Sequence, residues 1–242
     1  MSGGTLRTTG GTRTLANDVI ATASTTSNFL DNVTGGDLIF TGDFTGSGTL
    51  VIDSTVSRSL WLQGDGSGFT GEIHYTNNNN GTNLRLGGTG TSTNSSTNGS
   101  DWSSTAFVLS GSASNNRGLS WNGLTGATVK LGSLSGTGIL GNTANGANWE
   151  IGALNTDTQF SGAIRGSSSS LTKVGSGTLT LSGTSSYAGG TTISEGTLYI
   201  TNSSALGTGT VTLDGGTLQT SVNLANEAVA EKLTDDEIHF LR

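Results

Sequence analysis

The sequence predicts an all-β protein whose short strands stack into a parallel β-helix, a solenoid. Three observations predict this fold: a recurring strand-and-turn unit, a longer repeat, and a composition rich in glycine and free of proline. The chain has 242 residues, of which 40 are Gly and none is Pro. A proline cannot donate a hydrogen bond to a sheet, so its absence suits a chain whose backbone is nearly all paired. We therefore expect β-structure with many tight turns.

A five-residue unit recurs along the chain: an apolar residue, any residue, an apolar residue, any residue and Gly. Its copies LIFTG, LWLQG, FVLSG, LTLSG and VTLDG begin at Leu38, Leu60, Phe107, Leu179 and Val211. Alternation with a period of two places both apolar side chains on one face of a strand. The Gly that follows can adopt a positive φ, which allows a sharp turn. Each unit therefore predicts one short strand that ends in a corner.

The units belong to a longer repeat. LWLQGDGSGFTGEIHY from Leu60 and LTLSGTSSYAGGTTIS from Leu179 share the unit, an aromatic residue, a later Gly and an Ile. Gly-Thr-Leu triplets begin at Gly177, Gly196 and Gly216, which are 19 and 20 residues apart. A repeat of this length is typical of a solenoid, in which stacked repeats share a continuous apolar core. A β-sandwich is the structural alternative, but it would show antiparallel hairpin signals and a less regular repeat.

The stretch LTKVGSGTLTLSGTSSYAGGTTISEGTLYITNSSALGTGTVTLDGGTLQT from Leu171 closely resembles the autotransporter-associated β-strand repeat of Gram-negative surface proteins. The resemblance is clearest over residues 160–220 and looser over residues 2–155, and the predicted repeat region spans residues 1–221. It implies a right-handed parallel β-helix in the passenger region of an exported protein with a signal peptide and an outer-membrane barrel. We expect neither of these parts in this chain. MSGGTLRTTGG lacks the basic and apolar regions of a signal peptide.

Residues 222–242 differ sharply from the repeat. VNLANEAVAEKLTDDEIHFLR has no Gly and holds five of the chain's 17 acidic residues. Its apolar residues recur at helical spacing: Val222, Ala225, Val229 and Leu233. Thr234 and Glu237 could form the capping box of a second helix, which predicts an amphipathic helical hairpin. It could be a native cap of the last coil, a partner-binding helix or an engineered addition.

Few residues could perform catalysis. The chain has no Cys, and its two histidines, His74 and His239, lie in a sequence so rich in Ser that a chance Ser–His pair means little. Polysaccharide-cleaving β-helices need clustered acids. The acids that could line up across coils are Asp53, Asp65, Glu72 and Asp101. These acids are sparse and more typical of solvated corners, so we predict no catalytic, cofactor-binding or metal-binding residue.

A binding surface is the remaining possibility. The Ser/Thr/Asn-rich stretch at about residues 87–102 is predicted to be a projecting loop, and such loops often carry binding. The candidates for stacking on a sugar are the four tryptophans, although core packing is their commoner use: Trp61, Trp102, Trp121 and Trp149. A formal charge of −7 argues against nucleic acid as a partner, and no apolar run is long enough to cross a membrane.

These observations favour a non-catalytic fragment of a bacterial cell-surface or secreted β-solenoid that acts as a stalk or adhesion scaffold. Two alternatives stay open: a self-assembling extracellular fibre subunit whose ends stack, and a polysaccharide-degrading β-helix enzyme. The expected partners are a host or matrix glycan, a host or matrix protein, or a second copy of the chain stacked end to end. The expected location is the bacterial cell surface or the extracellular medium.

Overall fold

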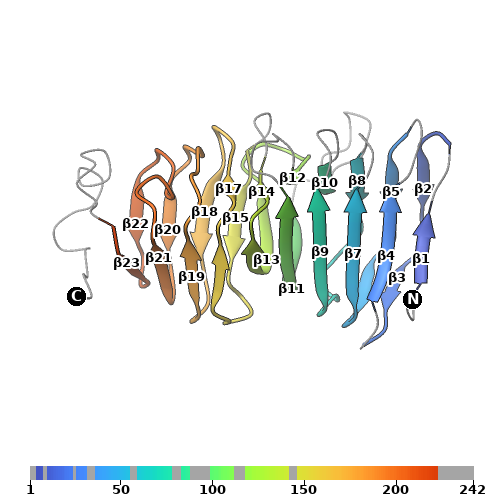
Figure 1. Cartoon of the computed structure of the whole chain (residues 1–242), viewed down its shortest axis with the longest axis horizontal. Helices are drawn as coiled ribbons and strands as arrows, with labels where there is room; N and C mark the ends of the chain where they lie inside the picture. Colours follow the sequence, from blue (N-terminus) through green and yellow to red (C-terminus); the bar gives the residue numbers. More distant parts are fainter. Residues whose placement is uncertain are drawn as a thin grey trace.

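The structure is a computed structural model that describes residues 4–7, 10–23, 26–31, 36–54, 59–77, 83–87, 99–111, 118–141 and 146–222. Within these ranges it contains strands and no helix. The strands lie side by side along one long axis and form an elongated parallel solenoid (Figure 1). The predicted all-β parallel architecture is therefore confirmed. The predicted helical hairpin at 222–242 lies, apart from Val222, outside the described residues.

Each coil passes through up to three faces. The first face contains β1 (Gly4–Arg7), β4 (Thr26–Asp31), β7 (Thr49–Ser54), β9 (Glu72–Asn77), the second parts of β11 (Ser100–Gly111) and β13 (Thr128–Gly136), β16 (Thr158–Phe160), β19 (Thr178–Leu181), β21 (Thr197–Ile200) and β23 (Thr217–Thr220). The second face contains β2 (Arg13–Leu15), β5 (Leu38–Phe40), β8 (Ser59–Leu62), β10 (Asn83–Leu86), β12 (Leu119–Trp121), β14 (Ile139–Leu140) and β17 (Ala163–Ile164). The third face contains the first parts of β11 and β13, β15 (Asn148–Ile151), β18 (Ser170–Lys173), β20 (Thr191–Ile193) and β22 (Val211–Leu213), and β3 (Val19–Ala21) and β6 (Phe44–Gly46) take the corresponding place in the first two coils.

The pairing register shows how the coil length changes along the chain. Gly4 pairs with Ser27, an offset of 23 residues, whereas Leu181 pairs with Ile200, an offset of 19. The offset reaches 34 between Ile73 and Phe107, in the coil that contains the Ser/Thr/Asn-rich stretch. The repeat length expected from the Gly-Thr-Leu triplets is therefore that of the C-terminal coils, and the earlier coils are longer.

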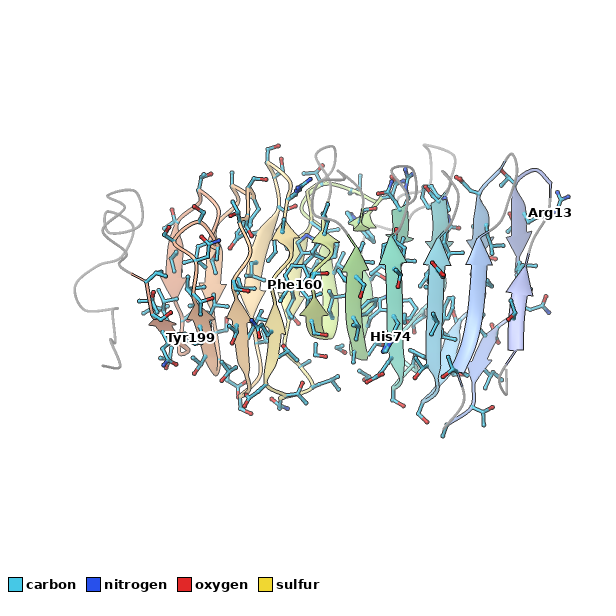
Figure 2. The ribbon with its side chains drawn as sticks, in the orientation of Figure 1. Arg13, His74, Phe160 and Tyr199 are labelled. Carbon is cyan, nitrogen blue, oxygen red and sulfur yellow. The ribbon has the colours of Figure 1, made fainter. Side chains whose placement is uncertain are left out.

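Alternating side chains build the core. In β19 and β21, Leu179, Leu181, Leu198 and Ile200 are buried, and the residues between them face outward. The register stacks Leu179 on Leu198 and Leu181 on Ile200, so each inward position continues the core of the coil before it. Phe160 lies in the same interior, whereas His74 and Tyr199 project from the outer side of the first face (Figure 2). Burial of these stacked columns is what stabilises coils that could not fold singly.

The glycines that end the five-residue units have two different roles. Gly111 and Gly215 have the expected positive φ, but Gly42, Gly64 and Gly183 do not. A Cβ at Gly64 would overlap the carbonyl oxygen of Gly42, and one at Gly183 would overlap that of Gly162. At these corners Gly is needed because adjacent coils approach too closely for any side chain.

Candidate functional site

The four tryptophans are all buried, with at most 3% of each exposed: Trp61, Trp102, Trp121 and Trp149. The ring of Trp102 lies 5.2 Å from that of Phe44 and 6.1 Å from that of Phe107, in an aromatic cluster inside the longest coil. Trp102, Trp121 and Trp149 belong to the core, whereas Trp61 lies on the outer side of β8 and is covered by neighbouring side chains. None of the four offers a ring face for a sugar.

The expected loop at residues 87–102 overlaps a strand. β11 begins at Ser100, and the indole nitrogen of Trp102 donates a hydrogen bond to the Ser100 hydroxyl at 2.8 Å. Residues 88–98 lie outside the described residues. The end of the predicted loop, Ser100 to Trp102, is therefore part of a strand, and the Trp102 ring lies in the core.

The acids considered for catalysis are not brought together. Glu72 pairs in register with Thr49 and Ala106, and its carboxylate lies 2.9 Å from Nε2 of His74 on the exposed side of β9. Asp53 pairs with Thr76, four residues further along the same strand. Asp101 belongs to the third face, where it lies 3.9 Å from Lys130. Among the described residues, no three His, Cys, Asp or Glu side chains gather where they could hold a metal ion.

Asp65 has a structural role that sequence reasoning missed. Asp43 accepts a hydrogen bond from the backbone N–H of Asp65 at 2.9 Å, and Asp18 accepts one from that of Asp43 at 2.9 Å. Asp65 in turn accepts from the hydroxyl and the N–H of Ser67, and these bonds lower the pKa of its carboxyl. The three acids form a ladder that ties one corner of three successive coils. The repeated Gly-Asp at residues 42–43 and 64–65 is the signal that could have revealed it.

A fourth acid, Asp37, ties adjacent coils together on the second face. Asp37 accepts hydrogen bonds from the backbone N–H of Ser59 and from the indole N–H of Trp61, both at 3.0 Å. The guanidinium of Arg85 lies 4.5 Å above the Trp61 ring, a cation–π contact between adjacent strands. These contacts hold the outer side of this face in place.

The described surface has two hollows of note. One, of about 360 Å³, lies at the first coil and is lined mainly by apolar side chains, among them Leu6, Leu15 and Ile20. The other, of about 460 Å³, is a polar groove on the outer side of the third face. Its floor is formed by outward side chains of β15, β18, β20 and β22, and Gly189 and Gly209 contribute to its side. This groove is the candidate binding site of the chain.

Comparisons with known proteins bear out the resemblance seen in the sequence. Residues 171–200, which run from β18 to β21, match the passenger-associated-transport-repeat family. A stretch of 120 residues, 49% of the chain, is 35% identical to the protein named "Adhesin BmaC autotransporter" of Brucella suis biovar 1 (strain 1330). The match spans 3% of that much longer relative. No helix in the described part of the chain is long and apolar enough to cross a membrane. The chain carries an autotransporter passenger repeat, folded as part of a parallel β-solenoid.

Proposed function

We propose that the chain is a non-catalytic part of an adhesin-like surface passenger and serves there as a stiff stalk or scaffold outside the cell. The observation that carries this proposal is the parallel pairing that continues from β1 to β23 on the first face through nine successive steps. The similarity to an autotransporter adhesin supports both the role and the location.

The physical basis of stiffness is the stacking itself. Each step adds about 4.8 Å, so nine steps give a rod of about 43 Å. Bending the rod would stretch ladder hydrogen bonds on one face and compress the core on another. The Asp18–Asp43–Asp65 ladder adds side-chain ties at a corner. A rod built in this way holds whatever it presents at a fixed distance from its anchor.

The test compares the chain with a flexible linker of equal length. Each is placed between an N-terminal epitope and a membrane-anchored carrier on a bacterial surface, and the cells are treated with a broad-specificity protease. We expect the epitope to survive much longer on the solenoid, because its backbone groups are paired in sheet. Loss of the epitope from both carriers at the same rate would contradict the stalk.

End-to-end self-association is a second candidate, favoured by the apolar hollow at the first coil. Ile20 is 59% exposed and lines this hollow together with Leu6 and Leu15. A second copy of the chain could cover this apolar surface. Sedimentation velocity over a range of concentrations tests this, with Ile20→Asp expected to suppress any growth in size. A monomer at every concentration would exclude it.

We do not propose a polysaccharide-degrading activity. The acids that it would need do not cluster: Asp101 lies on the third face, and on the first face Asp53 pairs with Thr76, four residues from Glu72. The relative that the chain matches is named as an adhesin.

A further inference from the structure

The geometry points to a binding site for a neutral oligosaccharide in the polar groove on the third face. This inference rests on the proposed function and names the class of ligand that the solenoid would bind. The groove runs over the outer side of four consecutive coils. Register pairs join Glu150 to Thr172, Thr172 to Thr192 and Thr192 to Thr212, so these four side chains form one file along the axis. We call them the groove file.

The groove file is available to a ligand. Leu171, Ile193 and Val211 point into the core, so the Thr residues beside them point outward. Neither the three Thr hydroxyls nor the Glu150 carboxylate has a hydrogen bond to another protein group among the described residues. Three groups that can donate and accept, followed by one acceptor, thus recur at the strand spacing of about 4.8 Å.

The rest of the groove is already organised. The Ser170 hydroxyl donates to the side-chain oxygen of Asn148 at 2.7 Å, and the Asn148 amide donates to the Gly126 carbonyl at 2.9 Å. Buried Thr191 is held by a hydrogen bond of 2.6 Å between its hydroxyl and that of Tyr187. Gly190 follows Ser170 in register and has no side chain, which leaves a depression beside the file. A ligand would therefore meet a preformed surface.

The lining selects the class of ligand. Apart from Ala188 it has no apolar side chain, so an apolar molecule would gain little there. It has no Lys or Arg but has Glu150, so an anion would be repelled. The backbone groups of β18 and β20 are used in pairing with the strands on either side, which leaves few for an extended peptide. A neutral sugar, whose hydroxyls pair with hydroxyls and carboxylate, satisfies the groove.

A glycan panel tests the assignment. The intact chain is displayed in multivalent form, because a site without an aromatic platform binds weakly and avidity makes such binding visible. The panel holds neutral gluco-, manno- and galacto-oligosaccharides together with sialylated and sulfated ones. We expect at least one neutral oligosaccharide to bind and the acidic glycans not to bind. The bound oligosaccharide is then titrated in solution.

The fold supplies a matched control. The triple variant Thr172→Val, Thr192→Val, Thr212→Val removes three groove hydroxyls without changing side-chain shape. The control variant Thr178→Val, Thr197→Val, Thr217→Val does the same to a file on the first face of nearly the same coils. Val suits strands, so both should fold, which circular dichroism checks. We expect the groove variant to lose at least tenfold in affinity, Glu150→Gln to lose less, and the control to bind like the unmodified chain.

Several outcomes would overturn the inference: no glycan bound, only acidic glycans bound, or equal losses in the two triple variants. The failure would remain distinct from failure of the stalk. If the rod resists protease but binds no sugar, the stalk function stands and the oligosaccharide site is refuted. If the chain is cleaved as fast as a flexible linker, the stalk function is refuted, whatever the glycan panel shows.

Discussion

Lys173 keeps its ammonium group inside the wall of the solenoid. Its side chain is 1% exposed, and Nζ donates hydrogen bonds to the carbonyls of Val174, Gly175 and Glu195 at 2.8, 2.7 and 3.2 Å. Burial lowers the pKa of this amine, and the charges of Glu195 and Asp157 oppose that shift. The ammonium thus joins two coils, because it donates hydrogen bonds to carbonyls of both.

We predict that Lys173→Met lowers the free energy of unfolding by about 2–3 kcal/mol, because three carbonyls lose their donor. Urea denaturation measures it. Lys130→Met is the control: Lys130 is 42% exposed and 3.9 Å from Asp101, so its loss should change stability by less than about 0.5 kcal/mol. Equal effects of the two substitutions would show that the three carbonyl contacts contribute nothing.

Tyr187 should make the protein sensitive to alkali. Burial raises the pKa of its hydroxyl well above the usual range, and the hydrogen bond with Thr191 only partly opposes this. The unfolded chain ionises first, from about pH 10, so stability is present below that pH and is lost as pH rises further. We predict a fall of up to about 1.4 kcal/mol per pH unit above pH 10 that Tyr187→Phe lacks.

The variant Tyr187→Phe separates the loss of stability at alkaline pH from the loss of a hydrogen bond. At neutral pH, Tyr187→Phe should be about 1 kcal/mol less stable, because the buried Thr191 hydroxyl loses its partner. The difference between the two proteins should therefore shrink between pH 9 and pH 11 in urea titrations. Parallel pH profiles would refute the assignment.

At the scale of the element, the corners set how closely coils can stack. Gly64 lies over Gly42, and Gly183 lies over Gly162, with no room between them for a methyl group. We predict that Gly183→Ala costs about 1–3 kcal/mol, because the added Cβ forces a backbone shift. Gly11→Ala, where a Cβ meets nothing within 4 Å, should be neutral or slightly stabilising. Thermal melts of the two variants measure this; a similar melting temperature for both would contradict it.

Over the whole molecule, the sequence pattern predicted which strand residues face the core, but it did not predict which residues of different coils lie next to each other. The period of two placed Leu179 and Leu181 in the core, because inward and outward positions follow from the strand alone. Alternation alone could not show that Asp18, Asp43 and Asp65 share a corner, because the signal for that lies in the Gly-Asp repeated at residues 42–43 and 64–65, one coil apart. The groove was missed for the same reason: its Thr residues are about 20 residues apart and meet only through the register.

Coils that contact only their neighbours should also respond locally to damage. Trp102 fills the interior of the longest coil, against Phe44, Phe69 and Phe107. We predict that Trp102→Ala costs about 3–5 kcal/mol through the cavity that it leaves. Hydrogen exchange should rise in β9, β11 and β13 and stay unchanged in β19, β21 and β23, because the C-terminal coils keep their own stacked core. A uniform rise along the chain would mean that the solenoid unfolds as one unit, in which case no segment of it could hold its shape independently of the rest.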